Sequence, residues 1–225
     1  LPTGKPFSKL IFADDQTIYA IGAARIARSR DGGKNWQAVE PKMKYSHCAA
    51  FSTAGTSRGM LFAGHGDAVA DAGFSRSTDL GETWERIGPT GLRVFDIAVH
   101  PESGTLIAGI VSAGYGCEIY RSAGAAASWQ RTFNFGSSAS VCGITFDETG
   151  VVYVASTGGR LIQSQDDGRS WTESLIPTKY KNIEVFASAG EGLLLAGKGW
   201  DAAYTSTDGG ASWNDISTGL PKEEF

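Results

Sequence analysis

The chain has 225 residues, of which 41% are hydrophobic and 20% charged, and its formal net charge is −4. A soluble domain of this size can bury a sizeable core without help from disulfides. The acidic balance argues against a nucleic-acid partner, and because no apolar run approaches the roughly 18 residues that span a bilayer, membrane insertion is not expected.

A short phrase that ends in tryptophan occurs five times along the chain. The copies are SRDGGKNW, STDLGETW, SAGAAASW, SQDDGRSW and STDGGASW, and they end at Trp36, Trp84, Trp129, Trp171 and Trp213. Successive tryptophans lie 42 to 48 residues apart, and a period in that range is typical of a four-stranded propeller blade. The repeat therefore predicts an all-β fold, a five-bladed β-propeller of four-stranded antiparallel blades.

The predicted blades follow one another within a single domain, 1–225, at 7–40, 45–88, 93–133, 139–175 and 182–217. In the third repeat, the runs VFDIAVH, TLIAGIV, CEIYRS and WQRTF have strand-like spacing, and PESG marks the first corner. With the strands named A to D from the inside outward, the repeated phrase forms the C-to-D turn. The N-terminal LPTGKPFSKLIF supplies a strand A for the first blade.

The residue types of the phrase suit a tight turn. Aspartate can accept hydrogen bonds from turn amides, glycine adopts a positive φ, and tryptophan covers the turn with an apolar face. Four copies keep the full pattern S-x-D-x-G-x-x-W, with their aspartates at Asp31, Asp79, Asp166 and Asp208. The third copy keeps Ser122 and Trp129 but has Gly124 and Ala126 in place of aspartate and glycine. Turn chemistry explains these aspartates better than catalysis or calcium binding does.

The pattern resembles the Asp-box, or BNR repeat, of sialidases, xyloglucan-cleaving endoglucanases, sortilin-type receptors and photosystem II assembly-factor propellers. The resemblance implies an Asp-box in each C-to-D turn, with the third copy degenerate. It also implies that ligands bind on the face opposite these turns, and it favours an extracytoplasmic location, either secreted or periplasmic. We expect no cofactor and no metal site.

A polar ring is expected near the mouth of the central channel. Counting from each tryptophan to the following strand A gives the positions Lys9, Cys48, Asp96, Cys142 and Glu184. Charged side chains on an inner strand are costly unless they are paired or hydrated. Asp96 and Glu184 could form the carboxylate pair of a glycoside hydrolase, with Lys9 orienting the substrate or tuning a pKa. Alternatively, the channel mouth is filled with water and Lys9 balances the two acids.

The loops on the face opposite the phrase offer aromatic and charged side chains, which are the usual materials of a sugar or peptide site. Trp200 is the most informative of them, because it lies outside the repeated phrase and no turn rule requires it. A loop with His65, Asp67 and Asp71 could suggest a metal, but no histidine cluster supports it. The predicted ligand-binding residues are Lys9, Tyr45, His65, Tyr115, Tyr180, Lys198, Trp200 and Asp201.

Signatures of known enzymes are missing from the sequence. It has no Arg-Ile-Pro segment of the sialidase type, no G-x-S-x-G, no P-loop and no H-E-x-x-H. We therefore expect a non-catalytic binding or assembly module, a monomer that recognises a protein segment or a glycan. Two alternatives stay open: a glycoside hydrolase using Asp96 and Glu184, and a piece of a larger repeat array or a pure scaffold. Cys48, Cys117 and Cys142 are expected to act as small buried hydrophobes.

Overall fold

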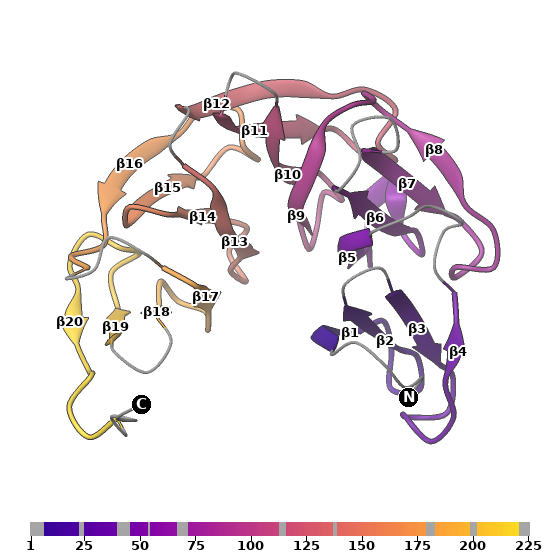
Figure 1. Ribbon diagram of the computed structural model, residues 1–225, viewed down its shortest axis with the longest axis horizontal. Coiled ribbons are helices and arrows are strands. Elements are labelled where there is room, and N and C mark those ends of the chain that lie inside the picture. The colour runs from indigo at the N-terminus through magenta and orange to yellow at the C-terminus, as the bar shows by residue number, and fades with distance from the viewer. Residues whose placement is uncertain are drawn as a thin grey trace.

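The computed structural model describes residues 7–22, 25–39, 46–53, 55–66, 72–112, 116–136, 139–178, 183–198 and 202–220. These residues form five four-stranded antiparallel sheets and one short 3-10 helix, η1 (Gly55–Ser57). The sheets follow one another around an arc as the blades of a β-propeller, with blade 1 and blade 5 at its two ends (Figure 1). The all-β, five-bladed fold predicted from the repeat is therefore confirmed.

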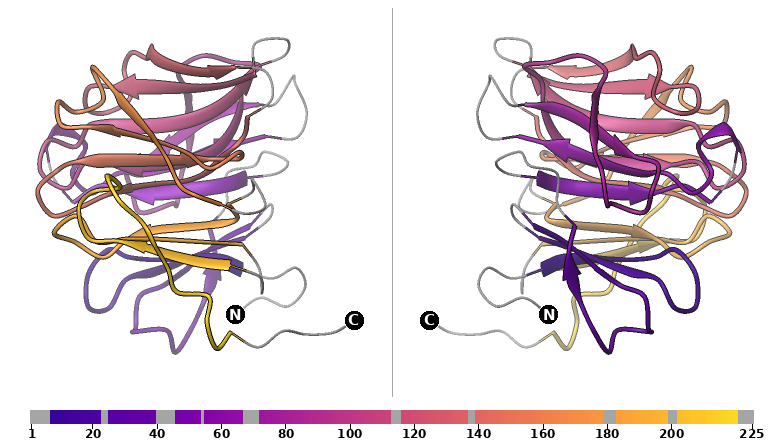
Figure 2. Two further views of the ribbon diagram at one scale, coloured as in Figure 1. Left: turned by 90° about the vertical axis from the view of Figure 1, so that its left-hand side faces the viewer. Right: turned by 90° about the vertical axis from the view of Figure 1, so that its right-hand side faces the viewer.

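Each blade is one continuous piece of chain, and its strands run from the inside of the arc outward in chain order (Figure 1). The strands are, in blade 1, β1 (Phe7–Phe12), β2 (Ile18–Gly22), β3 (Arg25–Ser29) and β4 (Gln37–Ala38); in blade 2, β5 (Ser46–Phe51), β6 (Leu61–His65), β7 (Gly73–Ser77) and β8 (Glu85–Ile87); in blade 3, β9 (Arg93–Val99), β10 (Leu106–Ser112), β11 (Gly116–Ser122) and β12 (Gln130–Gly136); in blade 4, β13 (Val141–Phe146), β14 (Val152–Ser156), β15 (Arg160–Ser164) and β16 (Thr172–Leu175); and in blade 5, β17 (Val185–Ser188), β18 (Leu194–Lys198), β19 (Ala202–Ser206) and β20 (Asn214–Asp215). Seen from the side, the turns lie at the two ends of the strands (Figure 2).

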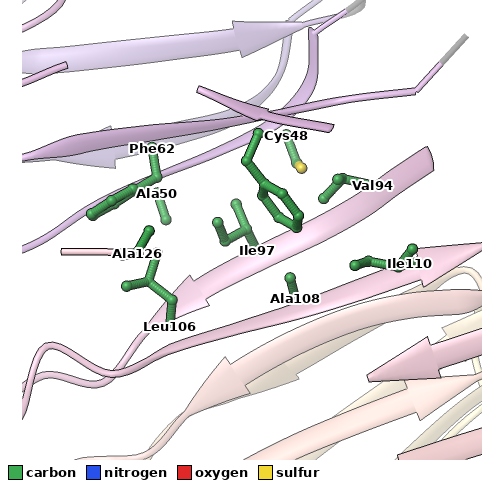
Figure 3. Close-up of a cluster of buried hydrophobic side chains, with 10 residues drawn as sticks. Cys48, Ala50, Phe62, Val94, Ile97, Leu106, Ala108, Ile110 and Ala126 are labelled. Atoms are coloured by element: carbon green, nitrogen blue, oxygen red, sulfur yellow. The ribbon is translucent and has the colours of Figure 1, made fainter. Parts of the chain in front are cut away.

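The hydrophobic core lies between the faces of successive blades. Between blades 2 and 3, Phe62 of β6 belongs to one buried cluster with Ile97 of β9 and Leu106 of β10 (Figure 3). The central strands β6 and β14 are buried along their whole described length, because each has a neighbouring blade on both sides. Such strands read as continuous apolar runs rather than as alternating ones.

The four complete turns of the repeat are closed by the same hydrogen bonds. In blade 2, the Ser77 hydroxyl donates to Asp79 Oδ1 at 2.8 Å and accepts from the Gly81 N–H at 2.7 Å. Asp79 Oδ1 also accepts from the Thr83 N–H at 2.8 Å. The Ser and Asp of the other three complete copies make the matching bonds. The serine and aspartate of the phrase thus serve the turn itself.

The third turn has no such carboxylate. The Ser122 hydroxyl is buried and makes no hydrogen bond within the described part of the chain. Ala125 and Ala126 follow it with φ of 47° and 56°, in the left-handed region that disfavours a Cβ. Because nothing replaces the aspartate, this turn is held by its packing and by contacts with the preceding blade.

Arginines on the third strands of blades 1 to 3 tie each blade to the turn of the next one. The guanidinium of Arg28 donates to the Leu80 carbonyl at 2.7 Å, and the Nε–H of Arg121 donates to the Asp167 carbonyl at 2.7 Å. Arg76 reaches the Ala125 carbonyl in the same way. Each arginine directly precedes the serine of its own phrase, so the repeated turn is also a joint between blades.

Replacing the turn serines tests this account of the turns. Ser77→Ala removes two hydrogen bonds and leaves the buried Gly81 N–H without its partner, so it should lower the free energy of unfolding by about 1–3 kcal/mol. Ser122→Ala removes a hydroxyl that makes no hydrogen bond there, so it should be neutral or slightly stabilising. Denaturant unfolding of both variants measures the difference. Equal losses in the two variants would contradict the account.

The turn carboxylates also predict how stability depends on pH. Hydrogen bonds, chiefly from Thr83, lower the pKa of Asp79 from 3.8 to about 2, and comparable bonds, chiefly from Asn35, lower the pKa of Asp31 to about 2. Because the folded pKa is the lower one, this stabilisation is present above about pH 4 and is lost as the pH falls towards 2. Thermal unfolding between these pH values should show a smaller decline for Asp79→Asn than for the parent chain. Asp15→Asn, at an exposed aspartate outside these turns, is the control and should leave the decline unchanged.

Candidate functional site

A hollow of about 490 Å³ lies on the inside of the arc, between the innermost strands β1, β5, β9 and β13. Large apolar side chains stand at equivalent register positions on three of these strands: Phe51 lies opposite Leu61, and Val99 and Phe146 hold the same place in blades 3 and 4. All three are partly exposed. We call this hollow the inner groove. Its volume falls in the range of small-ligand and peptide pockets.

The strands that line the inner groove are edge strands. β1, β5, β9 and β13 each pair with only one neighbour, so one side of each backbone is left without a sheet partner. An unpaired strand edge presents N–H and C=O groups that can pair with another chain. The inner groove therefore combines apolar side chains with backbone donors and acceptors.

Asp96 and Lys9 form an ion pair at the inner strands, with Lys9 Nζ 3.5 Å from Asp96 Oδ1. Asp96 Oδ1 also accepts from the N–H of Ile97, and Asp96 Oδ2 accepts from the N–H of Ile144, both at 2.9 Å. Ile144 belongs to the next blade, so this carboxylate joins blade 3 to blade 4 and contacts blade 1 through Lys9. Both carboxylate oxygens are thus engaged in the fold.

The structure does not bring Asp96 and Glu184 together as a catalytic pair. Glu184 is exposed in blade 5, where its N–H donates to the Gly197 carbonyl. Its nearest titratable neighbour is Cys142, whose pKa is raised to about 11 by burial and by the Glu184 charge. A glycosidase acid or nucleophile needs a carboxylate oxygen directed at the substrate. Asp96 has both oxygens occupied by backbone amides instead.

The expected ring is correct in three blades and shifted by one residue in the other two. Lys9, Cys48 and Asp96 lie opposite Ile21, Gly64 and Gly109 at one register position. In blades 4 and 5 that position is held by Gly143 and Val185, so Cys142 and Glu184 each lie one residue too early. Cys142 is skipped by a β-bulge, which a count along the sequence does not detect.

Of the predicted ligand-binding residues, Lys9, His65 and Lys198 are described. The prediction for His65 needs correction: it is fully buried, with Nε2 2.9 Å from the Ser75 hydroxyl on the neighbouring strand, and has no surface to offer a ligand. Lys198 ends β18 and is half-buried. Tyr45, Tyr115, Tyr180, Trp200 and Asp201 lie outside the described residues, as do Asp67 and Asp71.

The inner groove extends towards the end of the blades that carries the repeated turns. Its far rim is formed by Pro101, Asp147 and Glu148, which follow the innermost strands β9 and β13. Turns between first and second strands meet the repeated turns there: Ser103 and His100 both contact Asp167 Oδ1 at 3.3 Å. The sequence had instead placed the ligand on the opposite face. Its usable signal was a large apolar residue near the end of strand A in successive repeats.

The described cysteines are all free, with Cys48 and Cys117 buried and Cys142 half-buried. Burial raises the pKa of the Cys117 thiol to about 12 and that of Cys48 still further from its ordinary range. Within the described ranges, no three His, Cys, Asp or Glu side chains gather where they could hold a metal ion. The same ranges contain no helix that is long and apolar enough to cross a membrane.

Comparisons with known proteins give a likeness of fold. The chain matches no protein-family model and no curated protein sequence. Its structure is similar to that of virginiamycin B lyase from Staphylococcus aureus, with 16% identity and a TM-score of 0.74, over 98% of this chain and 73% of that one. The chain has a β-propeller fold.

Two other similar structures differ from the lyase in what their names state. A structure of YCF48 bound to D1 peptide shares 17% identity with a TM-score of 0.57, over 96% of this chain and 83% of that one. The GH74 xyloglucanase from Xanthomonas campestris shares 23% identity with a TM-score of 0.58, over 89% of this chain and 30% of that one. Identities this low show the shared fold and nothing finer.

The role assigned to Asp96 can be tested by substitution. Asp96→Ala leaves the N–H of Ile144 without its partner and should lower the free energy of unfolding by about 1–3 kcal/mol. Lys9→Met removes only a half-exposed ion pair and should cost less than about 1 kcal/mol. Denaturant unfolding compares the two variants. A larger loss for Lys9→Met than for Asp96→Ala would contradict the structural role of Asp96.

Proposed function

We propose that this propeller is a non-catalytic binding or assembly module that holds an extended protein segment in the inner groove. The observation that carries the proposal is the groove itself, about 490 Å³ between four innermost strands. Partly exposed apolar side chains at Phe51, Val99 and Phe146 would receive side chains of the segment. Burying them against a partner removes apolar surface from water.

The edge strands around the groove favour a peptide over a small apolar molecule. An extended segment can add its backbone N–H and C=O groups to an exposed strand edge while alternate side chains enter neighbouring pockets. Lys9 lines the same groove, and its ammonium is partly exposed beside Asp96. It could pair with an acidic side chain of the segment.

The similar folds support this proposal in general terms. One of them is named as bound to a peptide, and the xyloglucanase shows that propellers of this shape also occur in glycan-cleaving enzymes. We further propose that the chain is an Asp-box propeller, because four of its turns carry the Ser, Asp, Gly and Trp of that pattern with matching hydrogen bonds. A glycan remains the second candidate ligand. Hydrolysis by Asp96 and Glu184 has less support, since Asp96 is engaged by the backbone.

A matched pair of arginine substitutions tests the groove. Thr145 lines the groove on β13, and Thr172 lies exposed on the outermost strand of the same blade. Each hydroxyl makes one 3.4 Å hydrogen bond to a backbone carbonyl, so their replacement should disturb the fold to a similar, small extent. Peptides selected from a displayed library against the parent chain should bind Thr145→Arg at least about tenfold more weakly and Thr172→Arg unchanged.

Two outcomes would contradict the proposal. One is that no peptide is enriched against the parent chain. The other is that enriched peptides bind Thr145→Arg as tightly as Thr172→Arg. A glycan array probed with the same three proteins decides the second candidate: glycan binding lost in Thr145→Arg, together with no peptide enrichment, would identify a glycan site instead.

A further inference from the structure

Blade 5 leaves an apolar face exposed at its end of the arc. Val185 on β17 and Leu195 on β18 point to the same face, and they are 64% and 41% exposed. In the blades before it, the position of Leu195 is held by Tyr19, Phe62, Ile107 and Tyr153, none more than 3% exposed. Those four side chains are covered by the following blade. We call this surface of blade 5, with Val185, Ala187, Leu195 and Thr205, the forward face.

Blade 1 leaves the opposite kind of face exposed at the other end. Leu10 and Phe12 on β1 are 55% and 66% exposed. The position of Leu10 is held in blades 3 and 4 by Ile97 and Ile144, which are 0% and 6% exposed because the preceding blade covers them. We call this surface of blade 1, with Leu10, Phe12 and Ile18, the backward face.

The tryptophan of the first turn shows the same incompleteness. In blade 2, the Trp84 indole N–H donates to the Val39 carbonyl of the preceding blade at 2.7 Å as well as to its own turn. In blade 4, Trp171 donates to Thr132 of blade 3. Trp36 of blade 1 donates only to the Gly33 carbonyl of its own turn. Its side chain is placed to cover a preceding sheet, and none of the described strands lies there.

Packing between blades in this chain always joins a forward face to a backward face. The two free faces at the ends of the arc are therefore complementary halves of an interface that the chain already builds four times. We propose that a second copy of this chain occupies them, with the forward face of blade 5 packed on the backward face of blade 1 of the next copy. This proposal departs from the monomer expected from the sequence, and it does not depend on the proposed function.

A second copy is the chosen occupant because each chain carries both halves. The association is heterologous, so its repetition gives a closed ring or an open string of copies. One difference from the internal joints is Thr205, which stands where blades 1 to 3 have the joining arginine. The contact between copies therefore relies on burial of apolar side chains more than on that hydrogen bond.

Aspartate substitutions at equally exposed leucine, valine and phenylalanine positions test the proposal. Phe12→Asp alters the backward face, Val185→Asp the forward face, and Leu175→Asp a side chain that is 67% exposed on the outermost strand of blade 4. None of the three lines the inner groove. In sedimentation velocity at increasing concentration, the parent chain and Leu175→Asp should associate. The first two variants should each raise the apparent Kd at least about tenfold.

Mixing the two impaired variants gives the sharpest result. Val185→Asp retains an intact backward face and Phe12→Asp an intact forward face, so an equimolar mixture should form one-to-one dimers that neither variant forms alone. A parent chain that stays monomeric at all concentrations would overturn the proposal. So would a mixture that fails to dimerise, or a loss of association in Leu175→Asp equal to that in the two face variants. Circular dichroism confirms that all variants are folded before they are compared.

Discussion

The packing of one sheet face on the next is the constraint on which the rest of this structure depends. A four-stranded sheet of this sequence cannot satisfy itself, because its central strands are apolar on both faces. Each blade must therefore have a neighbour on both sides. Burial on both faces gives the core, places the innermost strands around a common hollow, and leaves unfinished faces wherever a neighbour is missing.

The repeated turns set the spacing of these layers. Their serines and aspartates close the turn locally, while the tryptophan and the joining arginine reach the adjacent blade, as Trp84 and Arg28 do. The phrase thus encodes both the shape of a blade and its attachment. This double role explains why the degenerate third copy still fits: Ser122 has lost its acceptor, but Arg76 of blade 2 still donates to the turn carbonyl of Ala125.

Much of the fold could be predicted from the sequence, because the tryptophan spacing measures a blade directly. The candidate site could be predicted only in part. Asp96 was found by counting from Trp84, and its position is correct. Cys142 was misplaced because a β-bulge consumes one residue of β13. His65 was taken for a loop residue, yet it is the last residue of β6 and is buried against Ser75. The inner groove joins segments of four blades that are distant in sequence, so no local pattern reveals it.

The central claim is that the inner groove, rather than the outer rim or the ends of the arc, is the binding surface for a protein segment. Hydrogen–deuterium exchange with and without a selected peptide tests this claim most directly, because it reports each strand separately. The account predicts slower exchange of backbone amides in the innermost strands β5, β9 and β13. Protection confined to the outermost strands, or to the loops opposite the repeated turns, would contradict it.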